Sequence, residues 1–333
     1  MRALVVRGPG LVALEEVAAP VADQGSVLVQ PVMVGLCGTD LEIIDGRIDP
    51  AYVRLPLVIG HEWVGAVAHP QQAAGHAAGA RVVVEGIVPC RHCRACVAGD
   101  TNRCHTYDEF GFIRAGAAAD LVSAPEFLVH PLSETVSDES GVLVEPASVV
   151  LRAVQRAAPR PGMKVLIVGD GTVGLLAATL VRLWSPASVT MLGARPQQQA
   201  LAEAANVDQF RLQQENTTGY DLVVEAAGTS AAVGAALASP TRGGTVVLLG
   251  LAGSGVSAPL LVDDLVNSDV TVMGSFSYTA AAWAGVVELL NSGRLDLSFL
   301  VTHSYPLADW SRALQTLRTP SGARGKVVLT IDR

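Results

Sequence analysis

The chain has 333 residues, half of them hydrophobic and only 16% charged, which is enough for two well-packed domains and excludes a disordered protein. A net charge of −8 without any basic block argues against a nucleic-acid-binding surface. The N-terminus has no signal-peptide pattern, and no apolar run is long enough to cross a membrane. We therefore expect a cytoplasmic protein with neither nucleic acid nor a membrane as its partner.

The N-terminal part of the chain is predicted to be mainly β-structure. Short apolar runs separated by Gly and Pro turns extend to about residue 68, and the clearest strands lie at 27–34 and 63–68. A further strand is expected at 81–85.

The next part of the chain combines an irregular lobe with a helix. Residues 90–104 carry four cysteines and are expected to form a loop lobe. Residues 126–136 are predicted to form a strand that leads into a helix from about Asp138. This helix contains Glu145 and continues through Arg156.

A strand, a glycine turn and a helix follow one another in the middle of the chain. Residues 165–168 are apolar and partly β-branched, as in a strand buried on both faces, and 175–184 are typical of a covered helix. The glycines between them have the pattern G-x-G-x-x-G, in which the backbone approaches a pyrophosphate at a helix N-terminus. A second apolar strand at 188–192 supplies the context that this weak pattern needs. The turn residues expected to bind a dinucleotide are Gly169, Gly171, Thr172, Val173 and Gly174.

The end of the second strand distinguishes NAD from NADP. An NAD site carries Asp or Glu about twenty residues after the glycine turn, where the carboxylate binds the ribose 2′-hydroxyl. This chain has Gly193 there, followed by Ala194 and Arg195. A carboxylate would repel a 2′-phosphate, whereas Gly removes charge and bulk and Arg195 offers a guanidinium that can hold phosphate. The sequence therefore predicts NADP, with NAD as the alternative if Arg195 only caps a loop.

Strands and helices alternate from Lys164 to about Gly274, which is the pattern of a parallel doubly wound sheet. The later elements expected are strands at 222–225 and 245–249, helices at 279–292 and 307–317, and a final strand at 326–330. The fold class is therefore predicted to be α/β, with a Rossmann-type sheet and a second, mainly β part.

Four of the five cysteines lie in one short segment. These are Cys90, Cys93, Cys96 and Cys104. Four thiolates at such spacing on one loop suit a tetrahedral Zn²⁺ closed to water, which is a structural zinc site in a reducing compartment. Because four thiolates exceed the charge of the ion, neighbouring arginines are expected to offset the excess. These are Arg91, Arg94 and Arg103.

A second set of potential metal ligands is dispersed along the sequence. Cys37, His61, Glu62 and Glu145 are far apart, so their spacing alone proves nothing. A lone Cys or His in an apolar setting is more often simply buried. Residue types alone leave open both a metal site and an ordinary buried cluster.

In combination, the motifs of this chain resemble those of the zinc-dependent medium-chain alcohol and polyol dehydrogenases over essentially its full length. No single motif is specific by itself. The matching pieces are Cys37-Gly38-Thr39-Asp40, Gly60-His61-Glu62, the four-cysteine lobe, Val144-Glu145-Pro146, Gly169-x-Gly171-x-x-Gly174 and Gly325-Lys326-Val327-Val328-Leu329. Glu145 as a ligand resembles the polyol and sugar branch, and Gly193-x-Arg195-Pro196 resembles the NADP-preferring members.

The resemblance implies a domain arrangement and cofactors. Residues 1–146 and 275–333 would form a mainly β, GroES-like catalytic domain with the structural zinc lobe at about 90–104. Residues 147–274 would form the Rossmann dinucleotide-binding domain. The resemblance also implies two Zn²⁺ per chain, NADP or NAD as cofactor, and a homodimer or homotetramer joined through the nucleotide-binding domain.

The resemblance also implies a catalytic zinc. Cys37, His61 and Glu145 would hold it, with Glu62 as a ligand in some states and a neighbour of the ligands in others. The zinc would raise the acidity of a bound alcohol, and the adjacent carbon would give hydride to the nicotinamide.

Three further residues have implied roles near the first zinc-binding cysteine. Thr39 would pass the substrate proton outward. The alternative is that its hydroxyl serves only as a helix cap. Asp40 would orient a histidine ligand, or serve as a charge at a helix N-terminus. Glu42 stands where many relatives have a relay histidine, and it is the candidate proton acceptor beyond Thr39.

The function expected is hydride transfer between a secondary alcohol, polyol or sugar hydroxyl and NADP. One alternative is a zinc-independent quinone or enone reductase of the same fold, and another is a non-catalytic zinc protein that senses nucleotide. Among substrates, aldoses, polyols, aminocyclitols, threonine and simple secondary alcohols all stay open.

Overall fold

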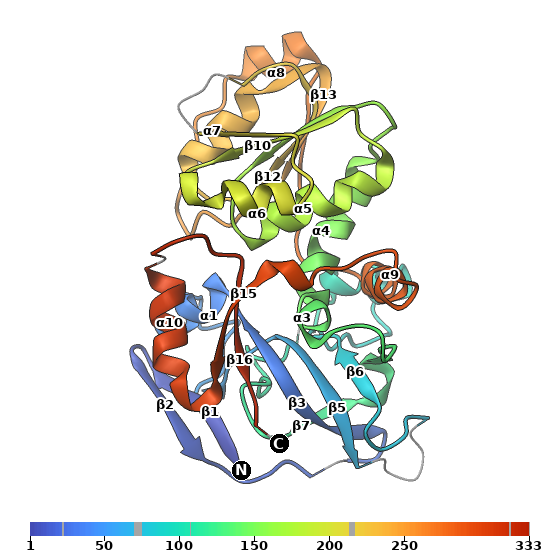
Figure 1. The fold of residues 1–333 in the computed structure, drawn as a ribbon, viewed down its shortest axis with the longest axis vertical. Helices are drawn as coiled ribbons and strands as arrows, with labels where there is room; N and C mark the ends of the chain where they lie inside the picture. Colours follow the sequence, from blue (N-terminus) through green and yellow to red (C-terminus); the bar gives the residue numbers. More distant parts are fainter. Residues whose placement is uncertain (22, 70–74, 107, 213–216, 320, 333) are drawn as a thin grey trace. The chain divides into compact units, whose positions relative to one another are not determined.

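The computed structural model describes residues 1–21, 23–69, 75–106, 108–212, 217–319 and 321–332 (Figure 1). They fall into two compact units. Unit 1 consists of Met1–Glu145, Thr279–Ser321 and Lys326–Arg333, and unit 2 consists of Pro146–Tyr278 and Gly322–Gly325.

Unit 1 is built mainly of β-strands. One sheet has the order β2-β1-β4, and a second has the order β15-β16-β3-β5-β6-β8, with β7 pairing with β3. The strands are β1 (Arg2–Gly8), β2 (Leu11–Glu16), β3 (Ser26–Leu36), β4 (Leu57–Val58), β5 (Glu62–His69), β6 (Arg81–Val84), β7 (Val122–Pro125), β8 (Val129–Pro131), β15 (Val301–Pro306) and β16 (Lys326–Thr330). The helices include α1 (Gly38–Ile44), α2 (Arg94–Val97), α3 (Asp138–Gly141), α9 (Ala280–Asn291) and α10 (Trp310–Arg318).

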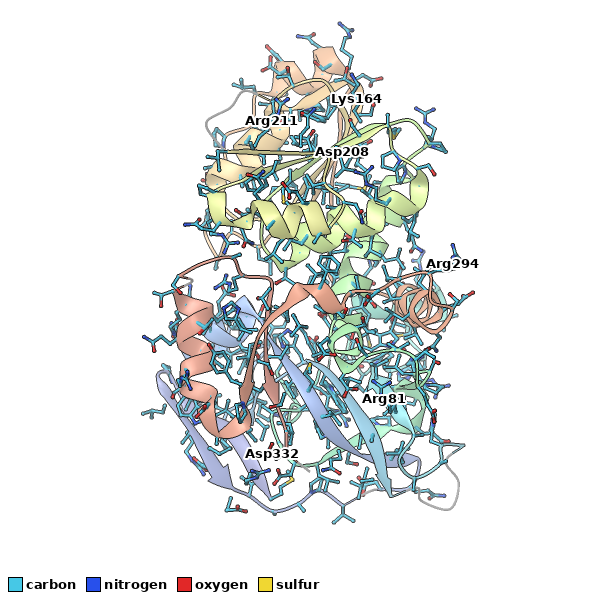
Figure 2. All side chains as sticks on the ribbon, in the orientation of Figure 1. Arg81, Lys164, Asp208, Arg211, Arg294 and Asp332 are labelled. Carbon is cyan, nitrogen blue, oxygen red and sulfur yellow. The ribbon has the colours of Figure 1, made fainter. Side chains whose placement is uncertain are left out.

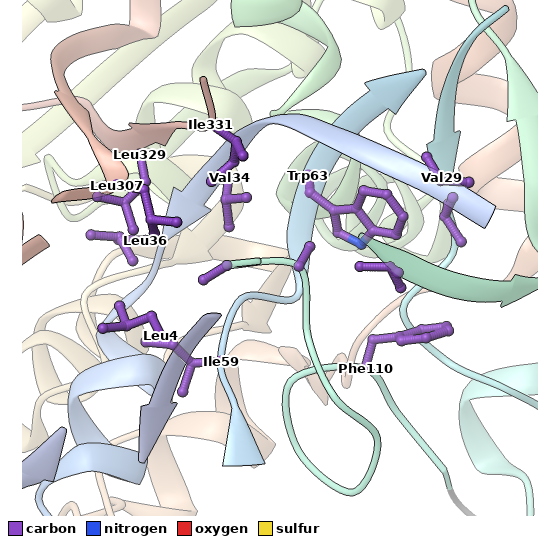
Figure 3. Packing of buried hydrophobic residues seen from close by; sticks show 14 of the residues in the cluster. Leu4, Val29, Val34, Leu36, Ile59, Trp63, Phe110, Leu307, Leu329 and Ile331 are labelled. Atoms are coloured by element: carbon purple, nitrogen blue, oxygen red, sulfur yellow. The ribbon is translucent and has the colours of Figure 1, made fainter. Parts of the chain in front are cut away.

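A large hydrophobic cluster lies in the interior of unit 1 (Figure 3). A smaller, separate cluster contains Ala3, Val5, Val58 and Ala119. Val34 and Leu36 of β3, Trp63 of β5 and Leu329 of β16 are all buried in the large cluster. Completely burying such a side chain contributes about 1.5–3 kcal/mol. The large cluster therefore fixes the facing ends of β3 and β5, from which the candidate site residues project.

One helix expected from the sequence is two helices in the structure. α3 (Asp138–Gly141) ends before α4 (Val144–Ala157) begins. Pro146 explains the break, because its ring would clash with the carbonyl group of Val142 in a continuous helix. In the first turn of α4 that proline is tolerated, and Glu145 lies in the same turn as expected.

The strand expected at 126–136 is also shorter in the structure. Residues 126–128 form a 3₁₀ turn, and β8 ends at Pro131, which has no N–H group to continue a ladder. Beyond it, the carbonyl groups of Ser133 and Val136 accept hydrogen bonds from Arg81 of β6 (labelled in Figure 2). These carbonyl groups are satisfied by a side chain instead of by a strand.

Unit 2 contains a parallel sheet with the order β11-β10-β9-β12-β13-β14. Its strands are β9 (Lys164–Val168), β10 (Ser188–Gly193), β11 (Gln209–Leu212), β12 (Tyr220–Glu225), β13 (Pro240–Leu248) and β14 (Thr271–Gly274), and its helices include α5 (Thr172–Val181), α6 (Gln199–Ala204), α7 (Ser230–Ala238) and α8 (Val262–Ser268). The strand order reverses direction at β9, the switch point at which such sheets bind ligands. The predicted doubly wound sheet is confirmed. None of the helices in the described part of the chain has the length and apolar character needed to cross a membrane.

Candidate functional site

Four cysteine side chains come together in the lobe of unit 1. The sulfur atoms of Cys90, Cys93, Cys96 and Cys104 all lie within 4.8 Å of one another. α2 begins directly after Cys93 and contains no buried residue. The lobe therefore has little apolar core of its own, and the sulfurs are its centre.

Backbone N–H groups surround these sulfurs. The N–H of Cys90 donates to Sγ of Cys104 at 3.2 Å, and the N–H of Cys93 donates to Sγ of Cys90 at 3.3 Å. The N–H groups of His92 and Cys93 lower the pKa of Cys90 to about 5, whereas burial raises the pKa of Cys96 to about 12. Four thiols this close cannot all lose their protons without a cation between them, and tetrahedral Zn²⁺ fits the donor set.

Two of the three neighbouring arginines, Arg91 and Arg103, have other partners. Arg103 forms an ion pair with Asp100 at 3.2 Å, and the guanidinium of Arg91 lies over the ring of Phe127. The negative charge of the sulfurs is therefore stabilised by hydrogen bonds from backbone N–H groups. The sequence pattern did not indicate these hydrogen bonds.

The pairing of two strands brings Cys37, His61 and Glu62 together. Cys37 follows β3, His61 precedes β5, and the two strands are antiparallel with Gly35 opposite Glu62. The end of one strand thus lies beside the beginning of the other. One ligand atom from each of the three residues lies within 4.8 Å of the others, and we call these residues the donor group.

Asp40 organises the cysteine and the histidine of the donor group. Its Oδ2 accepts a hydrogen bond from the N–H of Cys37 at 2.8 Å, and its Oδ1 lies 3.5 Å from Nδ1 of His61. Burial opposes a positive charge on His61, but Asp40 and Cys37 raise the pKa of its imidazole well above the ordinary value. Asp40 can hold Nδ1–H and leave Nε2, 3.9 Å from Oε1 of Glu62, as the ligand atom.

Lys326 is a member of this site that the sequence analysis did not identify. It forms a buried ion pair with Glu62. Gly35 leaves the space for this pair, because a Cβ there would collide with both side chains. Burial alone would lower the pKa of Lys326, but Glu62 and Cys37 raise it. The available signal was a single charged residue in an otherwise apolar strand.

Two more buried carboxyl groups lie beside the donor group. Burial raises the pKa of Glu145, and the charge of Glu62 raises it further. Burial also raises the pKa of Glu109 to about 8, with His61 opposing the shift and Glu145 adding to it. Within the described residues, Glu145 is a neighbour of the donor group and not one of the residues that meet within 4.8 Å. Glu109 had no sequence signal.

The two proton-transfer candidates lie on α1. Oγ1 of Thr39 is 3.6 Å from Sγ of Cys37, next to the donor group. The carboxylate of Glu42 lies 4.0 Å from the guanidinium of Arg47. Glu42 is not part of the donor group in the described part of the chain.

The chemistry of the donor group fits zinc. A thiol, an imidazole and a carboxylate are the side chains that bind Zn²⁺ in proteins, and three protein ligands leave a position for substrate in catalytic sites. Buried acidic groups around Lys326 also favour a second cation, because unpaired buried charge is costly.

The glycine turn of unit 2 has the space that a dinucleotide needs. Gly169 adopts a φ of +121°, and a Cβ at Gly174 would collide with its carbonyl oxygen. Gly171 precedes α5, and a Cβ there would meet nothing within 4 Å. A pyrophosphate can therefore approach the N–H groups at the beginning of α5.

The remaining predicted cofactor residues lie around this turn. Thr172 and Val173 begin α5, and the hydroxyl of Thr172 donates to a backbone carbonyl group at 3.0 Å. Gly193 is buried at the end of β10. The guanidinium of Arg195 forms an ion pair with Asp170 at 2.8 Å.

Unit 1 is mainly β and brings a thiol, an imidazole and a carboxylate together, and unit 2 is a doubly wound sheet with an open glycine turn. This combination is that of the zinc- and nicotinamide-dependent dehydrogenases. Residues 23–134 match the alcohol dehydrogenase GroES-like domain, and residues 138–320 match the glucose dehydrogenase C-terminus. The chain belongs to the zinc-dependent medium-chain alcohol and polyol dehydrogenase family. It is an NAD(P)-dependent dehydrogenase that acts on CH–OH donors.

Similar proteins cover nearly the whole chain. The erythritol/L-threitol dehydrogenase of Mycolicibacterium smegmatis is 31% identical over 94% of this chain and 93% of its own. The sorbitol dehydrogenase of Bacillus subtilis is 30% identical, covering 95% and 93%. A Sinorhizobium meliloti protein described as a zinc-binding dehydrogenase, solved with NADP bound, superimposes with a TM-score of 0.92 at 25% identity, covering 99% and 98%. The predicted family, fold class and enzyme class are thereby confirmed.

Proposed function

We propose that the protein is a zinc-dependent dehydrogenase that transfers hydride between a CH–OH group of a small polyol and a nicotinamide cofactor, with NADP preferred. Unit 1 is then the catalytic domain and unit 2 the nucleotide-binding domain, with one catalytic and one structural Zn²⁺ per chain. The observation that carries this proposal is the donor group, in which half-buried Cys37 meets buried His61 and Glu62, with a further buried carboxyl group beside it.

In this proposal, residues of unit 1 bind the catalytic zinc. Cys37, His61 and Glu145 are its proposed ligands, and Glu62, paired with Lys326, is the alternate carboxylate. Zinc bound there supplies Lewis acidity toward the oxygen of the substrate alcohol.

Residues next to the proposed zinc ligands orient His61 and take the proton from the substrate alcohol. Asp40 fixes the tautomer of His61 through Nδ1. Thr39 takes the substrate proton at Oγ1 and passes it outward, with Glu42 as the proposed acceptor beyond it. The ring of Phe112 lies 5.3 Å from the imidazole of His61, centroid to centroid, and limits the access of water to that ligand.

Polyols are the substrate class that the surroundings support best. Glu109 is a buried carboxyl group whose pKa is raised by burial, and a carboxyl group in this place can form hydrogen bonds with a substrate hydroxyl. The two named relatives with at least 30% identity act on erythritol or threitol and on sorbitol. We therefore place four- to six-carbon polyols ahead of aldoses, aminocyclitols, threonine and simple alcohols.

The proposed preference for NADP rests on the sequence at the end of β10, where the structure also has the carboxylate of Asp170 paired with Arg195. Gly193 brings no carboxylate of its own to the ribose, and Arg195 follows it as a cation for a 2′-phosphate. The Sinorhizobium relative was solved with NADP. We also propose a cytoplasmic location, because the five cysteines are unpaired thiols suited to a reducing compartment.

The test is an assay of four- to six-carbon polyols with NADP and with NAD, together with the zinc content of the purified protein. We expect NADPH formation and about two zinc ions per chain. Cys37→Ala and Glu145→Ala are each expected to abolish turnover while the fold survives, with the exposed Glu203→Ala as control. Full activity in either ligand variant, with zinc retained, would contradict the assignment.

A further inference from the structure

Asp170 places a carboxylate at the end of β10, where Gly193 has no side chain of its own. It belongs to the glycine turn between β9 and α5 and is only 7% exposed. Its Oδ2 accepts hydrogen bonds from the N–H groups of Ala194 and Arg195, each at 2.9 Å. A Cβ built on Gly193 would lie 2.9 Å from the same oxygen and would collide with the ring of Phe210. A larger residue at 193 would require the ring of Phe210 and the carboxylate of Asp170 to move.

This carboxylate occupies the region in which an NAD site places its ribose-binding acid. It also holds Arg195. Oδ1 of Asp170 accepts from Nη2 of Arg195 at 2.8 Å and from Nε at 3.2 Å, and the backbone carbonyl of Asp170 accepts from Nη2 at 3.1 Å. The guanidinium proposed for the 2′-phosphate is thus already paired with a negative charge.

The rest of the cluster anchors the pair. Gln198 donates from Nε2 to the carbonyl groups of Asp170 and Arg324 and accepts at Oε1 from the N–H of Arg324 at 2.7 Å. Burial and the nearby charge of Arg195 lower the pKa of Arg324. Nη1 of Arg195 is buried and has no hydrogen-bond partner in the described part of the chain. The charge of Asp170 thus acts on both guanidinium groups, and Nη1 of Arg195 is left as a donor for an anion.

We infer that Asp170 is a specificity-determining residue of the cofactor site: its carboxylate competes with a 2′-phosphate for Arg195 and keeps the site open to NAD as well as NADP. A 2′-phosphate must displace or share the ion pair, whereas the two hydroxyls of the NAD ribose leave it in place and can donate to the carboxylate. This inference rests on the proposed function, because it needs a nicotinamide dinucleotide bound at the glycine turn of unit 2.

The test is a fluorescence titration of the purified full chain with NADPH and with NADH, which measures binding without turnover. Asp170→Asn keeps an oxygen for the N–H groups of residues 194 and 195 but removes the charge that holds Arg195. We expect the ratio of NADPH affinity to NADH affinity to rise by about tenfold or more, as for the loss of a charge-assisted competitor. Asp170→Ser serves the same purpose if the first variant folds poorly.

Two further variants isolate the cause. Asp208 (labelled in Figure 2) makes a matched pair of contacts at the other end of β10, because its Oδ2 accepts from the N–H of Val189 and pairs with Arg182. We expect Asp208→Asn to leave the ratio unchanged. In the double variant Asp170→Asn/Arg195→Ala, the rise in the ratio of NADPH affinity to NADH affinity is expected to vanish.

Two outcomes would overturn the inference. An unchanged or lowered ratio in Asp170→Asn and Asp170→Ser, with both cofactors still bound, means that Asp170 does not compete for Arg195. If the wild-type protein binds neither NADPH nor NADH, the proposed function itself fails, which is a separate result.

Discussion

At the residue scale, the ion pair of Lys326 and Glu62 neutralises two buried charges in the candidate site. The two residues are 3% and 1% exposed. Removing one partner of such a pair leaves the other charge buried and unpaired, which typically costs about 3–5 kcal/mol. We therefore expect Lys326→Met to lower the free energy of unfolding by about that amount, measured by urea denaturation of the zinc-loaded protein.

Two controls accompany this variant. Glu62→Gln/Lys326→Met removes both charges and should recover most of the lost stability. Arg312→Met breaks the exposed pair with Asp309 and should cost less than about 1 kcal/mol. Equal losses in the buried and exposed single variants would show that burial is not the cause.

The site residues found from the sequence are those with restricted chemistry. Cys37 and His61 occur in recognisable motifs, and a close group of them with Glu62 is present in the structure. Lys326, Glu109 and Asp170 were assigned no role, because a lysine, a glutamate or a turn aspartate in a sequence looks like an exposed residue. These three residues are brought to their charged neighbours by strand pairing and burial. Both depend on distant parts of the chain and cannot be seen in a local sequence pattern.

At the element scale, the lobe at 90–104 depends on its sulfurs. α2 has no buried residue, and Val97 within it is 75% exposed. We expect Cys104→Ser to lower the zinc content by about one ion per chain. It should also lower Tm by about 5 °C or more, since 1 kcal/mol shifts Tm by roughly 2–4 °C in domains of moderate size. Elemental analysis and calorimetry measure both effects.

Limited proteolysis separates this lobe from the catalytic site. Trypsin can cut after Arg91, Arg94 or Arg103, and Cys104→Ser should make these bonds accessible. Cys37→Ser is the matched control, because it also removes one thiol and should abolish turnover while leaving the lobe resistant. Unchanged zinc content and unchanged proteolysis in Cys104→Ser would refute a structural metal in the lobe.

The extent of an element could be predicted where its apolar pattern is strong. The helix expected at 279–292 is α9 (Ala280–Asn291), and the strand at 165–168 is β9. The break between α3 and α4 was missed because the apolar pattern continues through it, whereas Pro146 interrupts the backbone hydrogen bonds. β7 and β8 are short, and strands of this length carry too few residues for a clear alternation.

At the scale of the whole chain, the polypeptide leaves unit 1 after Glu145 and returns to it at Thr279. β16, near the C-terminus, pairs with β3, near the N-terminus, and brings Lys326 to the donor group. Local periodicity indicates that both strands exist, but it contains no information about which strands pair. That pairing is decided by the burial of their shared core residues, such as Val34 and Leu329.

The apolar surface of unit 2 points to self-association. α8 contains no buried residue, and β14 is the last strand of its sheet. Leu261, Val262 and Val266 are each at least 62% exposed. Large exposed apolar patches and open strand edges mark interfaces in soluble proteins. We therefore expect the wild-type protein to be a homodimer or a homotetramer of such dimers, joined through α8 and β14, with the mass measured by light scattering during gel filtration.

Charge placed on this surface should separate the copies. We expect Leu261→Asp/Val266→Asp to halve the mass or reduce it to that of one chain, because two carboxylates would be buried without partners. Leu11→Asp, which changes an equally exposed apolar residue on β2 of unit 1, should leave the mass unchanged. A monomeric wild-type protein, or an unchanged mass in the double variant, would mean that another surface or none joins the copies.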